Sequence, residues 1–310
     1  MRWVALVVVA VGAAAGFAPA DRRRPASGDA QIRGKAGPSE IVVTTTSRTA
    51  GAIHSLTWMG KEFLDSTDHG RQLQSACSFG TGDWKDFHAE AYNPTEAGAR
   101  RDATGPRSSS RLAGLQARGN ELVTVVRPAF WLAPGERSGP FPARNAQPLS
   151  DVLITKRVTV GYKGFAHAID YRVTFAVPEG EKHTLAQFEA LTGYMPAEFA
   201  RFWALDPKTG QLAPLTDGPG EQPLPVVFST ENGMWAMGVW SPERPDGQTG
   251  PGYGRWRFPA ERVVKWNCVF RVQNAMGVKP GDYSYRMFVA VGSLQNVRDT
   301  LVGVMKEEKK

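Results

Sequence analysis

Apolar and polar residues alternate with a period of two along most of this chain, a pattern typical of β-strands that bury one face. The alternation is clearest in residues 153–175, where two such runs flank the turn at 161–164 and predict a long antiparallel hairpin. A second hairpin is predicted across Glu231-Asn232-Gly233, because Asn-Gly favours tight turns between antiparallel strands. Further strands are predicted at residues 53–58, 73–79, 122–126, 184–192, 226–229, 235–240, 255–258, 263–272 and 283–291.

Only the last segment of the chain has helical spacing. Ser293 is a suitable N-cap, and Val297, Leu301 and Val304 fall on one face of a helix. Many short strands and one terminal helix predict an all-β fold, a large antiparallel β-sandwich with one short C-terminal helix. Residues 39–310 are expected to form it as a single domain, with long turn-rich loops at 134–148 and 247–254.

The first twenty residues have the order of a secretory signal peptide. Arg2 precedes an apolar run from Trp3 to Phe17, and Ala18-Pro19-Ala20 resembles a cleavage site. The run is short for a membrane span, although the basic residues 22–24 leave an uncleaved anchor as the alternative. We therefore expect an exported protein, secreted or periplasmic, with no membrane association after signal cleavage. The polar, basic residues 21–38 are expected to be a flexible tether.

Charge and cysteine content narrow the classes of partner. The formal net charge is +7, and the chain has neither a long Lys/Arg run nor a nucleic-acid motif, so no nucleic-acid partner is expected. Two cysteines are too few for a disulfide scaffold or a zinc cluster. Cys77 and Cys268 each fall on the apolar face of their predicted strand. They can therefore either form a disulfide or remain two separate buried thiols.

Residues 51–102 contain the densest mixture of ionisable and aromatic side chains, and within them His69 and Arg71 are the first candidates. Imidazole titrates near neutral pH and guanidinium matches a carboxylate in bidentate fashion, so His69 is a candidate acid/base and Arg71 a candidate anion clamp. The alternative is an ion pair between Asp68 and Arg71 that stabilises a turn, with His69 only packing.

A loop further along offers carboxylates, a phenol and an amide, which suit cleavage of a glycosidic bond. Glu90 is a candidate catalytic residue, and Tyr92, Asn93 and Glu96 are candidate substrate ligands. The alternative is an ordinary Asn-Pro turn with solvated acids. His69, His88 and Glu90 together match no compact metal motif, so neither a metal nor a cofactor is expected.

Two later segments complete the candidate site. Glu189 interrupts an apolar strand, so it is a candidate general acid with a raised pKa, or else an outward residue on a solvated sheet face. Tyr194, shortly after it, is a candidate substrate ligand. Aromatic side chains around a glycine-rich loop suit sugar rings, although core packing explains them equally well. These candidate ligands are Trp240, Tyr253, Arg255 and Trp256.

The stretch 51–64 (GAIHSLTWMGKEFL) resembles the opening hairpin of the galactose-mutarotase-like group, large antiparallel β-supersandwiches found in sugar epimerases, polysaccharide lyases and glycoside hydrolases. The stretches 68–72, 92–98 and 191–196 are similar to uncharacterised exported bacterial proteins of that kind. The resemblance implies this fold and a role in carbohydrate chemistry. The His-Pro-Tyr-Phe-Asn type stretch that carries the acid histidine of true mutarotases is missing from the chain.

These patterns together predict an exported carbohydrate-active enzyme that cleaves a glycosidic bond, either a glycoside hydrolase or a polysaccharide lyase. A non-catalytic carbohydrate-binding protein and a sugar epimerase are the alternatives. The expected partner is a carbohydrate ligand, and the mildly basic charge makes an acidic sugar one option.

Overall fold

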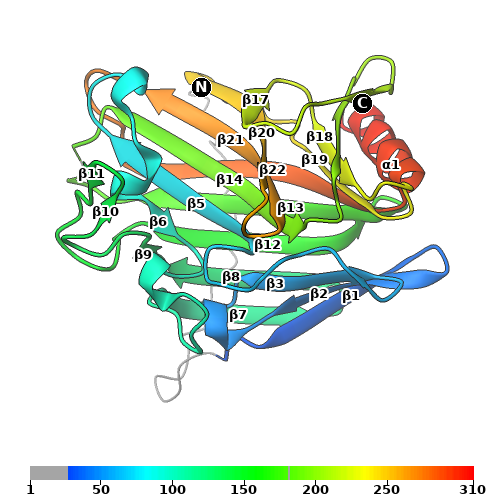
Figure 1. Ribbon diagram of the computed structural model, residues 1–310, viewed down its shortest axis with the longest axis horizontal. Helices are drawn as coiled ribbons and strands as arrows, with labels where there is room; N and C mark the ends of the chain where they lie inside the picture. Colours follow the sequence, from blue (N-terminus) through cyan, green and yellow to red (C-terminus); the bar gives the residue numbers. More distant parts are fainter. Residues whose placement is uncertain (1–26, 181) are drawn as a thin grey trace, which may run out of the picture.

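The computed structural model describes residues 27–180 and 182–310, which form two antiparallel sheets, a two-stranded ribbon and one α-helix (Figure 1). This architecture confirms the predicted all-β sandwich with a C-terminal helix. The predicted signal peptide lies outside the described residues. No helix within the described ranges is long and apolar enough to cross a membrane.

The first sheet has 11 strands, with a main path in the order β1-β2-β3-β5-β14-β21-β20-β17. Its strands are β1 (Ala30–Ala36), β2 (Ser39–Thr45), β3 (Ile53–Trp58), β4 (Lys61–Glu62), β5 (Leu73–Gly80), β6 (Pro94–Thr95), β9 (Ala129–Phe130), β14 (Leu185–Pro196), β17 (Gly220–Gln222), β20 (Gln248–Phe258) and β21 (Val263–Gln273).

The second sheet has 9 strands in the order β16-β15-β18-β19-β22-β13-β12-β8-β7. Its strands are β7 (Arg111–Arg118), β8 (Glu121–Arg127), β12 (Leu153–Tyr162), β13 (Phe165–Val177), β15 (Arg201–Leu205), β16 (Leu212–Pro214), β18 (Val226–Ser229), β19 (Ala236–Trp240) and β22 (Gly281–Gly292).

The main core lies between the two sheets, where the alternation seen in the sequence gives each strand one buried face. In β13, Tyr171 and Phe175 are fully buried in this core, while Asp170 and Arg172 lie on the opposite face. The predicted hairpins β12–β13 and β18–β19 both form. Cys77 and Cys268 are buried and not joined as a disulfide, so the alternative of two separate thiols holds.

Strand β1 corrects the predicted tether, which is wrong from Ala30 onwards. The whole of β1 pairs with β2, from Ala30 opposite Thr45 to Ala36 opposite Ser39. Ile32 and Ala36 are buried in the core, so the polar composition of this segment conceals a strand with one apolar face. Gly34 allows close packing, because a Cβ atom there would lie 2.7 Å from Cγ1 of Val160 in β12.

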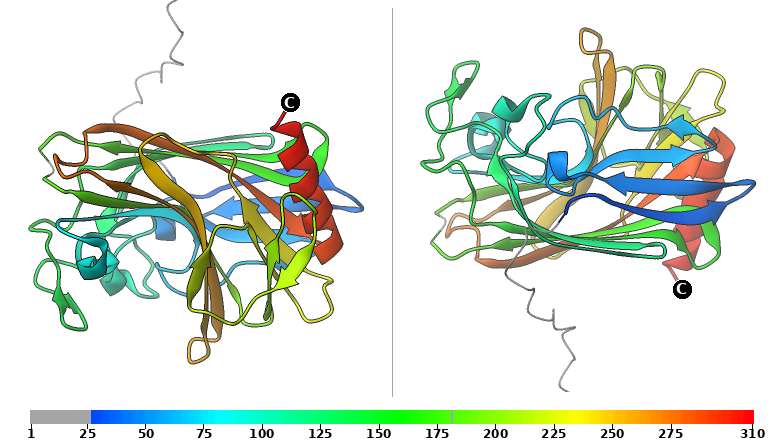
Figure 2. Two further views of the ribbon diagram at one scale, coloured as in Figure 1. Left: turned by 90° about the horizontal axis from the view of Figure 1, so that it is seen from above. Right: turned by 90° about the horizontal axis from the view of Figure 1, so that it is seen from below.

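Helix α1 (Leu294–Glu307) covers the outer face of the second sheet, at one end of the sandwich (Figure 2). Ser293 caps it by accepting a hydrogen bond from the amide of Asn296, as predicted. Val297, Leu301 and Val304 are buried against this sheet in a second apolar cluster. The predicted helical spacing is therefore confirmed.

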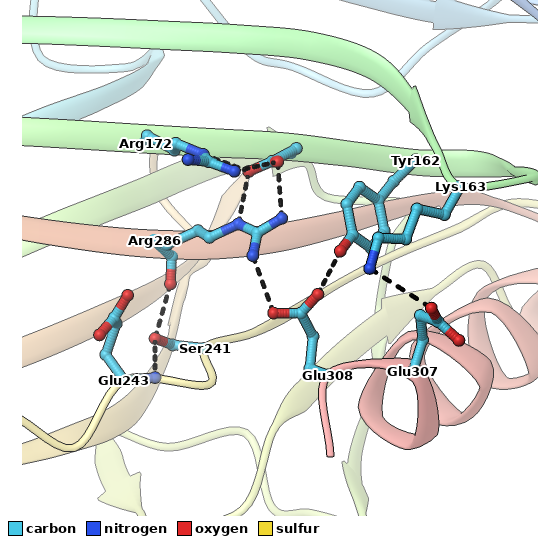
Figure 3. A network of polar contacts seen from close by, with 9 residues as sticks. Tyr162, Lys163, Arg172, Ser241, Glu243, Arg286, Glu307 and Glu308 are labelled. Atoms are coloured by element: carbon cyan, nitrogen blue, oxygen red, sulfur yellow. Dashed lines mark hydrogen bonds and ion pairs between the residues drawn. The ribbon is translucent and has the colours of Figure 1, made fainter. Parts of the chain in front are cut away.

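The end of α1 is anchored by a polar network on the second sheet (Figure 3). Arg286 donates to both carboxylate oxygens of Asp170, at 3.0 and 2.8 Å, and to Glu308 at 2.8 Å. Burial raises the pKa of Asp170, but the hydrogen bonds from Arg286 and Arg172 outweigh burial, so the pKa is lowered overall. Asp170, Arg172, Arg286 and Glu308 are all joined by ion pairs, which indicates a structural clamp.

At the opposite end from α1, the segments that follow β5 cover part of the first sheet (Figures 1 and 2). All eight residues of β5 are buried, because these segments lie over its outer face. They contain the 3₁₀ helices η2 (Trp84–Asp86), η3 (Ala89–Tyr92) and η4 (Arg100–Asp102), and η1 (Ser47–Thr49) precedes β3.

Two predicted loops contain strand structure. The loop at 134–148 carries a small ribbon, β10 (Arg137–Ser138) with β11 (Phe141–Pro142). The loop predicted at 247–254 lies almost entirely within β20, so that prediction is wrong. The pairing of β20 with β21 shifts register between Thr249 and Gly252, and this irregularity accommodates the glycines in a strand.

Candidate functional site

A pocket of about 320 Å³ lies on the outer face of the first sheet, over four neighbouring strands. This volume is at the lower end of the range of roughly 300–1,000 Å³ found for small-molecule sites. Its floor consists of Gln74, Ala76 and Ser78 of β5, Gln187, Glu189, Thr192 and Tyr194 of β14, Lys265 and Asn267 of β21, and Trp256 and Phe258 of β20. Its walls consist of Gly70, Ala89, Glu90, Asn93, Thr95 and Trp131.

A β-bulge in β14 brings the functional groups of this strand onto one face. The pairing with β21 and with β5 shifts register immediately after Glu189. Ala190 and Leu191 are consecutive, yet both are fully buried in the core. The extra residue resets the alternation, so that Glu189 and Tyr194 both line the pocket. Ser75 holds the bulge, because its Oγ donates to the carbonyl oxygen of Ala190 at 2.7 Å.

Glu189 is held in the pocket floor through one of its two carboxylate oxygens. Oε1 accepts a hydrogen bond from Nδ2 of Asn267 at 2.7 Å and lies 2.8 Å from Nζ of Lys265. Oε2 has no partner among the described residues. The side chain of Glu189 is 18% exposed, so water and a ligand can reach this second oxygen from the pocket. The predicted proton-donor role does not fit this geometry, because a neutral carboxyl group would give up the ion pair with Lys265.

Asn267 owes its orientation to a glycine on the neighbouring strand. Its Oδ1 accepts a hydrogen bond from the amide of Gly254 at 3.0 Å, which leaves Nδ2 to donate to Glu189. A Cβ atom on residue 254 would lie 2.2 Å from the Trp256 ring and 2.5 Å from Oδ1 of Asn267. Gly254 therefore lets both side chains lie close to the backbone of β20.

Lys265 lies against two aromatic rings of the pocket. Its Nζ is 5.2 Å from the ring centre of Tyr194 and 5.1 Å from that of Trp256. Burial lowers the pKa of Lys265, but the charge of Glu189 and the Tyr194 hydroxyl outweigh burial and raise it well above its usual value. Burial raises the pKa of Tyr194. At neutral pH the pocket therefore holds a lysine cation and a protonated tyrosine.

Glu90 lies on η3, in the segment that follows β5 and covers it (the covering segment), and it lines the pocket from there. Its carboxylate has no hydrogen-bond or ion-pair partner in the described part of the chain. Trp131 stands beside it in the wall. Gly70 makes room for that ring, since a Cβ atom at residue 70 would lie 2.8 Å from it. Asn93 donates to the carbonyl oxygen of Cys77 at 2.7 Å and to Oγ of Ser78 at 2.9 Å, which fixes the covering segment on β5.

Several predicted site residues meet in this pocket, although they come from distant parts of the sequence between residues 90 and 256. The pocket is lined by Glu90, Asn93, Glu189, Tyr194 and Trp256. The other candidates lie elsewhere, and each has a structural contact that explains its position.

His69 and Arg71 take the alternative that the sequence left open. His69 is buried, and its Nδ1 and Nε2 each lie 2.8 Å from a backbone carbonyl oxygen, of Ala103 and Arg48 respectively. Both ring nitrogens are therefore engaged, which does not fit the predicted acid/base role. Arg71 forms ion pairs with Asp68 at 3.1 Å and Asp65 at 3.9 Å, so it stabilises the turn instead of binding an anion.

Glu96 is a core residue and not a substrate ligand. Both it and its ion-pair partner Lys156 are fully buried, and its Oε2 accepts a hydrogen bond from the amide of Ser75 at 3.0 Å. Tyr92 packs edge-to-face against Phe130 with ring centres 4.6 Å apart, and it does not line the pocket. The backbone turn at Asn93-Pro94 thus directs successive side chains to different places.

The predicted aromatic platform is reduced to Trp256. Trp240 packs on Phe288 in the cluster beneath α1, on the second sheet. Tyr253 is buried on the core side of β20, and its hydroxyl accepts a hydrogen bond from the amide of Ser241 at 2.9 Å. Arg255 donates to the carbonyl oxygen of Thr216 at 2.7 Å. The prediction that these three residues bind substrate is wrong, because they lie on the core face, the other sheet or the sheet edge.

Lys265 and Asn267 were missed by the sequence reasoning. They alternate with the apolar positions Val264, Trp266 and Cys268, so their outward parity was visible. Their functional setting depends on register, because Lys265 lies opposite Tyr194 in the pairing of β21 with β14. A metal site at His69, His88 and Glu90 gains no support. Within the described ranges, no group of three or more His, Cys, Asp or Glu residues could hold a metal ion.

No protein-family model matches this sequence, and no curated protein matches it significantly. Solved structures with a similar chain path include Slr1438 from Synechocystis sp. PCC 6803, at 13% identity and a TM-score of 0.45 over 87% of this chain and 96% of that one. They also include a putative aldose 1-epimerase from Klebsiella pneumoniae, at 10% identity and a TM-score of 0.43 over 90% of this chain and 91% of that one.

A larger enzyme is also similar over part of its length. The heparan sulfate lyase HepC from Pedobacter heparinus matches at 9% identity and a TM-score of 0.41, over 86% of this chain and 35% of that one. Nothing about the chemistry of this chain follows from likenesses of that size, so its function has to be inferred from the pocket itself.

Proposed function

We propose that this chain is a carbohydrate-active enzyme that cleaves a glycosidic bond, with one sugar ring bound in the pocket on the first sheet. The observation that carries the proposal is a pair of carboxyl groups, Glu90 and Glu189, in one small pocket with different surroundings. Aromatic rings of Trp131, Tyr194 and Trp256 line the same space and suit the apolar faces of a sugar.

The surroundings assign different roles to the two carboxyl groups. Lys265 and Asn267 pair with the Glu189 carboxylate and fix its position, which suits a general base or a stabiliser of developing positive charge on the sugar. No cation pairs with Glu90 in the described part of the chain, so its carboxyl group is free to exchange a proton with the ligand, and it is assigned the proton donor to the leaving oxygen. Hydrolysis needs this division between two carboxyl groups.

The test is activity on a panel of poly- and oligosaccharides, read as new reducing ends and as the absorbance of an unsaturated uronate. Glu189→Gln and Glu90→Gln should each lower turnover by about 10²- to 10⁴-fold, because each removes one proton-transfer group. Glu261→Gln is the matched control, since Glu261 is an exposed glutamate outside the pocket, and it should retain full activity.

Binding of a saccharide without any turnover would replace this proposal with a carbohydrate-binding protein. Formation of an unsaturated uronate would replace hydrolysis with elimination. Export of the chain remains a prediction from residues 1–20, and an N-terminal sequence that begins at Asp21 in protein recovered from the periplasm or medium would support it.

A further inference from the structure

The charges in the pocket do not balance. Three charged side chains line it, Glu90, Glu189 and Lys265, and Lys265 is already paired with Glu189 at 2.8 Å. The remaining charge is the Glu90 carboxylate, which has no ion-pair partner in the described part of the chain. The pocket therefore carries a net negative charge and has no cation left over for an acidic ligand.

Three arginines that neighbour pocket residues in sequence or by hydrogen bond do not supply one. Arg271 donates from Nε to Gln187 at 3.0 Å and from both terminal nitrogens to Glu221 at 2.7 Å. Arg71 is engaged by Asp68 and Asp65. A third arginine, Arg257, donates to Asp217 at 2.9 Å and to the carbonyl oxygen of Ala200 at 2.7 Å. Each cation would have to leave a carboxylate before it could bind the acidic group of a ligand.

The hydrogen-bonding groups that face the pocket are complementary to hydroxyl groups. Gln187 accepts from Arg271 through Oε1, which leaves its Nε2 to donate into the pocket. Ser78 accepts from Asn93 through Oγ, which leaves its hydroxyl hydrogen to donate. Oε2 of Glu189 and the Glu90 carboxylate can only accept when ionised. A sugar hydroxyl both donates and accepts, so a neutral sugar ring satisfies both kinds of group.

We propose that the sugar bound in this pocket is uncharged, and that the pocket discriminates against uronic acids and other acidic sugars. This inference rests on the proposed function and specifies its substrate class. It reverses the option of an acidic ligand that the basic composition suggested, because the excess of basic residues lies outside the pocket.

The experiment is titration calorimetry of the full folded chain with matched pairs of methyl glycosides. The pairs are glucoside and glucuronide, galactoside and galacturonide, and mannoside and mannuronide. In each series that binds, the neutral member should bind at least about tenfold more tightly, because a ligand carboxylate would face the unpaired charge of Glu90 at short range. A salt concentration of about 1 M should narrow the difference in affinity between the neutral and the acidic glycoside, because salt screens the repulsion between carboxylates.

Glu90→Gln should reduce the preference for the neutral member by about threefold or more, because it removes the net charge of the pocket. The matched control Glu261→Gln should leave the preference unchanged. A uronide that binds as tightly as its neutral partner, or more tightly, would overturn the substrate class and leave the proposed function standing. Absence of binding in all three series, up to about 100 mM ligand, would overturn both, since such a pocket would hold no sugar.

Discussion

Lys156 and Glu96 form an ion pair between the two sheets, and Lys265 and Glu189 form another on the outer face of the first sheet. The residue types are the same, but the surroundings differ. Both side chains of the first pair are fully buried, whereas those of the second are 16% and 18% exposed. The comparison separates a charge pair that belongs to the structure from one that is available to a ligand.

The oxygen atoms of the two glutamates make the difference explicit. In Glu96 one oxygen contacts Lys156 and the other accepts from the amide of Ser75 at 3.0 Å, so neither remains free. In Glu189 a single oxygen contacts both Lys265 and Asn267, and the other faces the pocket. A fully engaged carboxylate stabilises the fold, whereas a half-engaged carboxylate at a pocket is positioned and still able to react.

The largest effect is expected from breaking the buried pair. Lys156→Met should lower the free energy of unfolding by about 3–5 kcal/mol, because it leaves the Glu96 carboxylate buried without a cation. Urea denaturation at neutral pH measures this loss. The double variant Lys156→Met with Glu96→Leu should recover most of it, since it removes both charges and fills the core with apolar side chains. A single variant with unchanged stability would contradict the structural assignment of this pair.

A smaller effect is expected at His69, which is buried, contacts two backbone carbonyl oxygens and lies outside the pocket. His69→Ala should cost about 1–3 kcal/mol of stability, since a carbonyl oxygen that loses its imidazole donor costs roughly that much. Turnover per folded molecule should not change. Thermal denaturation and a saccharide assay on the same preparation measure the two quantities.

His88→Ala is the matched control for His69→Ala, because His88 is half-buried and stacks on the exposed ring of Phe141 at 3.9 Å. It should cost about 1 kcal/mol or less, as for one exposed aromatic contact. A His69→Ala protein that keeps its stability and loses turnover would restore the catalytic role that the sequence suggested.

The fold was largely predictable from the sequence, because strand alternation is a local property. The alternation even places the side chain of Lys156 on the same face of its strand as Ile154 and Val158, where a lysine has to be buried with a partner. The partner was not predictable. Glu96 lies in a loop beside Asn93, and only the tertiary structure shows that one of these residues enters the core and the other the pocket.

The pocket was predictable in part, for a related physical reason. Glu189 was conspicuous as an acid in an apolar strand and Glu90 as one of two acids in a loop, but the bulge at Ala190 changes which residues share the face of Glu189. A bulge depends on pairing with neighbouring strands and leaves little trace in one strand's own sequence. Lys265 and Asn267 become site residues only through the register of β21 with β14. Sequence parity predicts the direction of a side chain, and register decides its neighbours.

Apart from the control at His88, the smallest effect is expected from breaking the pocket pair, and its pH dependence tests the comparison most sharply. Lys265→Met should cost only about 1–2 kcal/mol, because Asn267 still binds Glu189 and water in the pocket can hydrate it. The pKa of Lys265 is raised in the folded protein, so its stabilising contribution is complete below the unfolded value of about 10.4 and is lost only as pH rises beyond that. The difference in unfolding free energy between wild type and Lys265→Met should therefore stay constant between about pH 7 and pH 9. Urea denaturation of both proteins at several pH values in that window measures this difference, and a gap that closes below about pH 9 would show that Lys265 loses its proton early and does not pair with Glu189 as a cation.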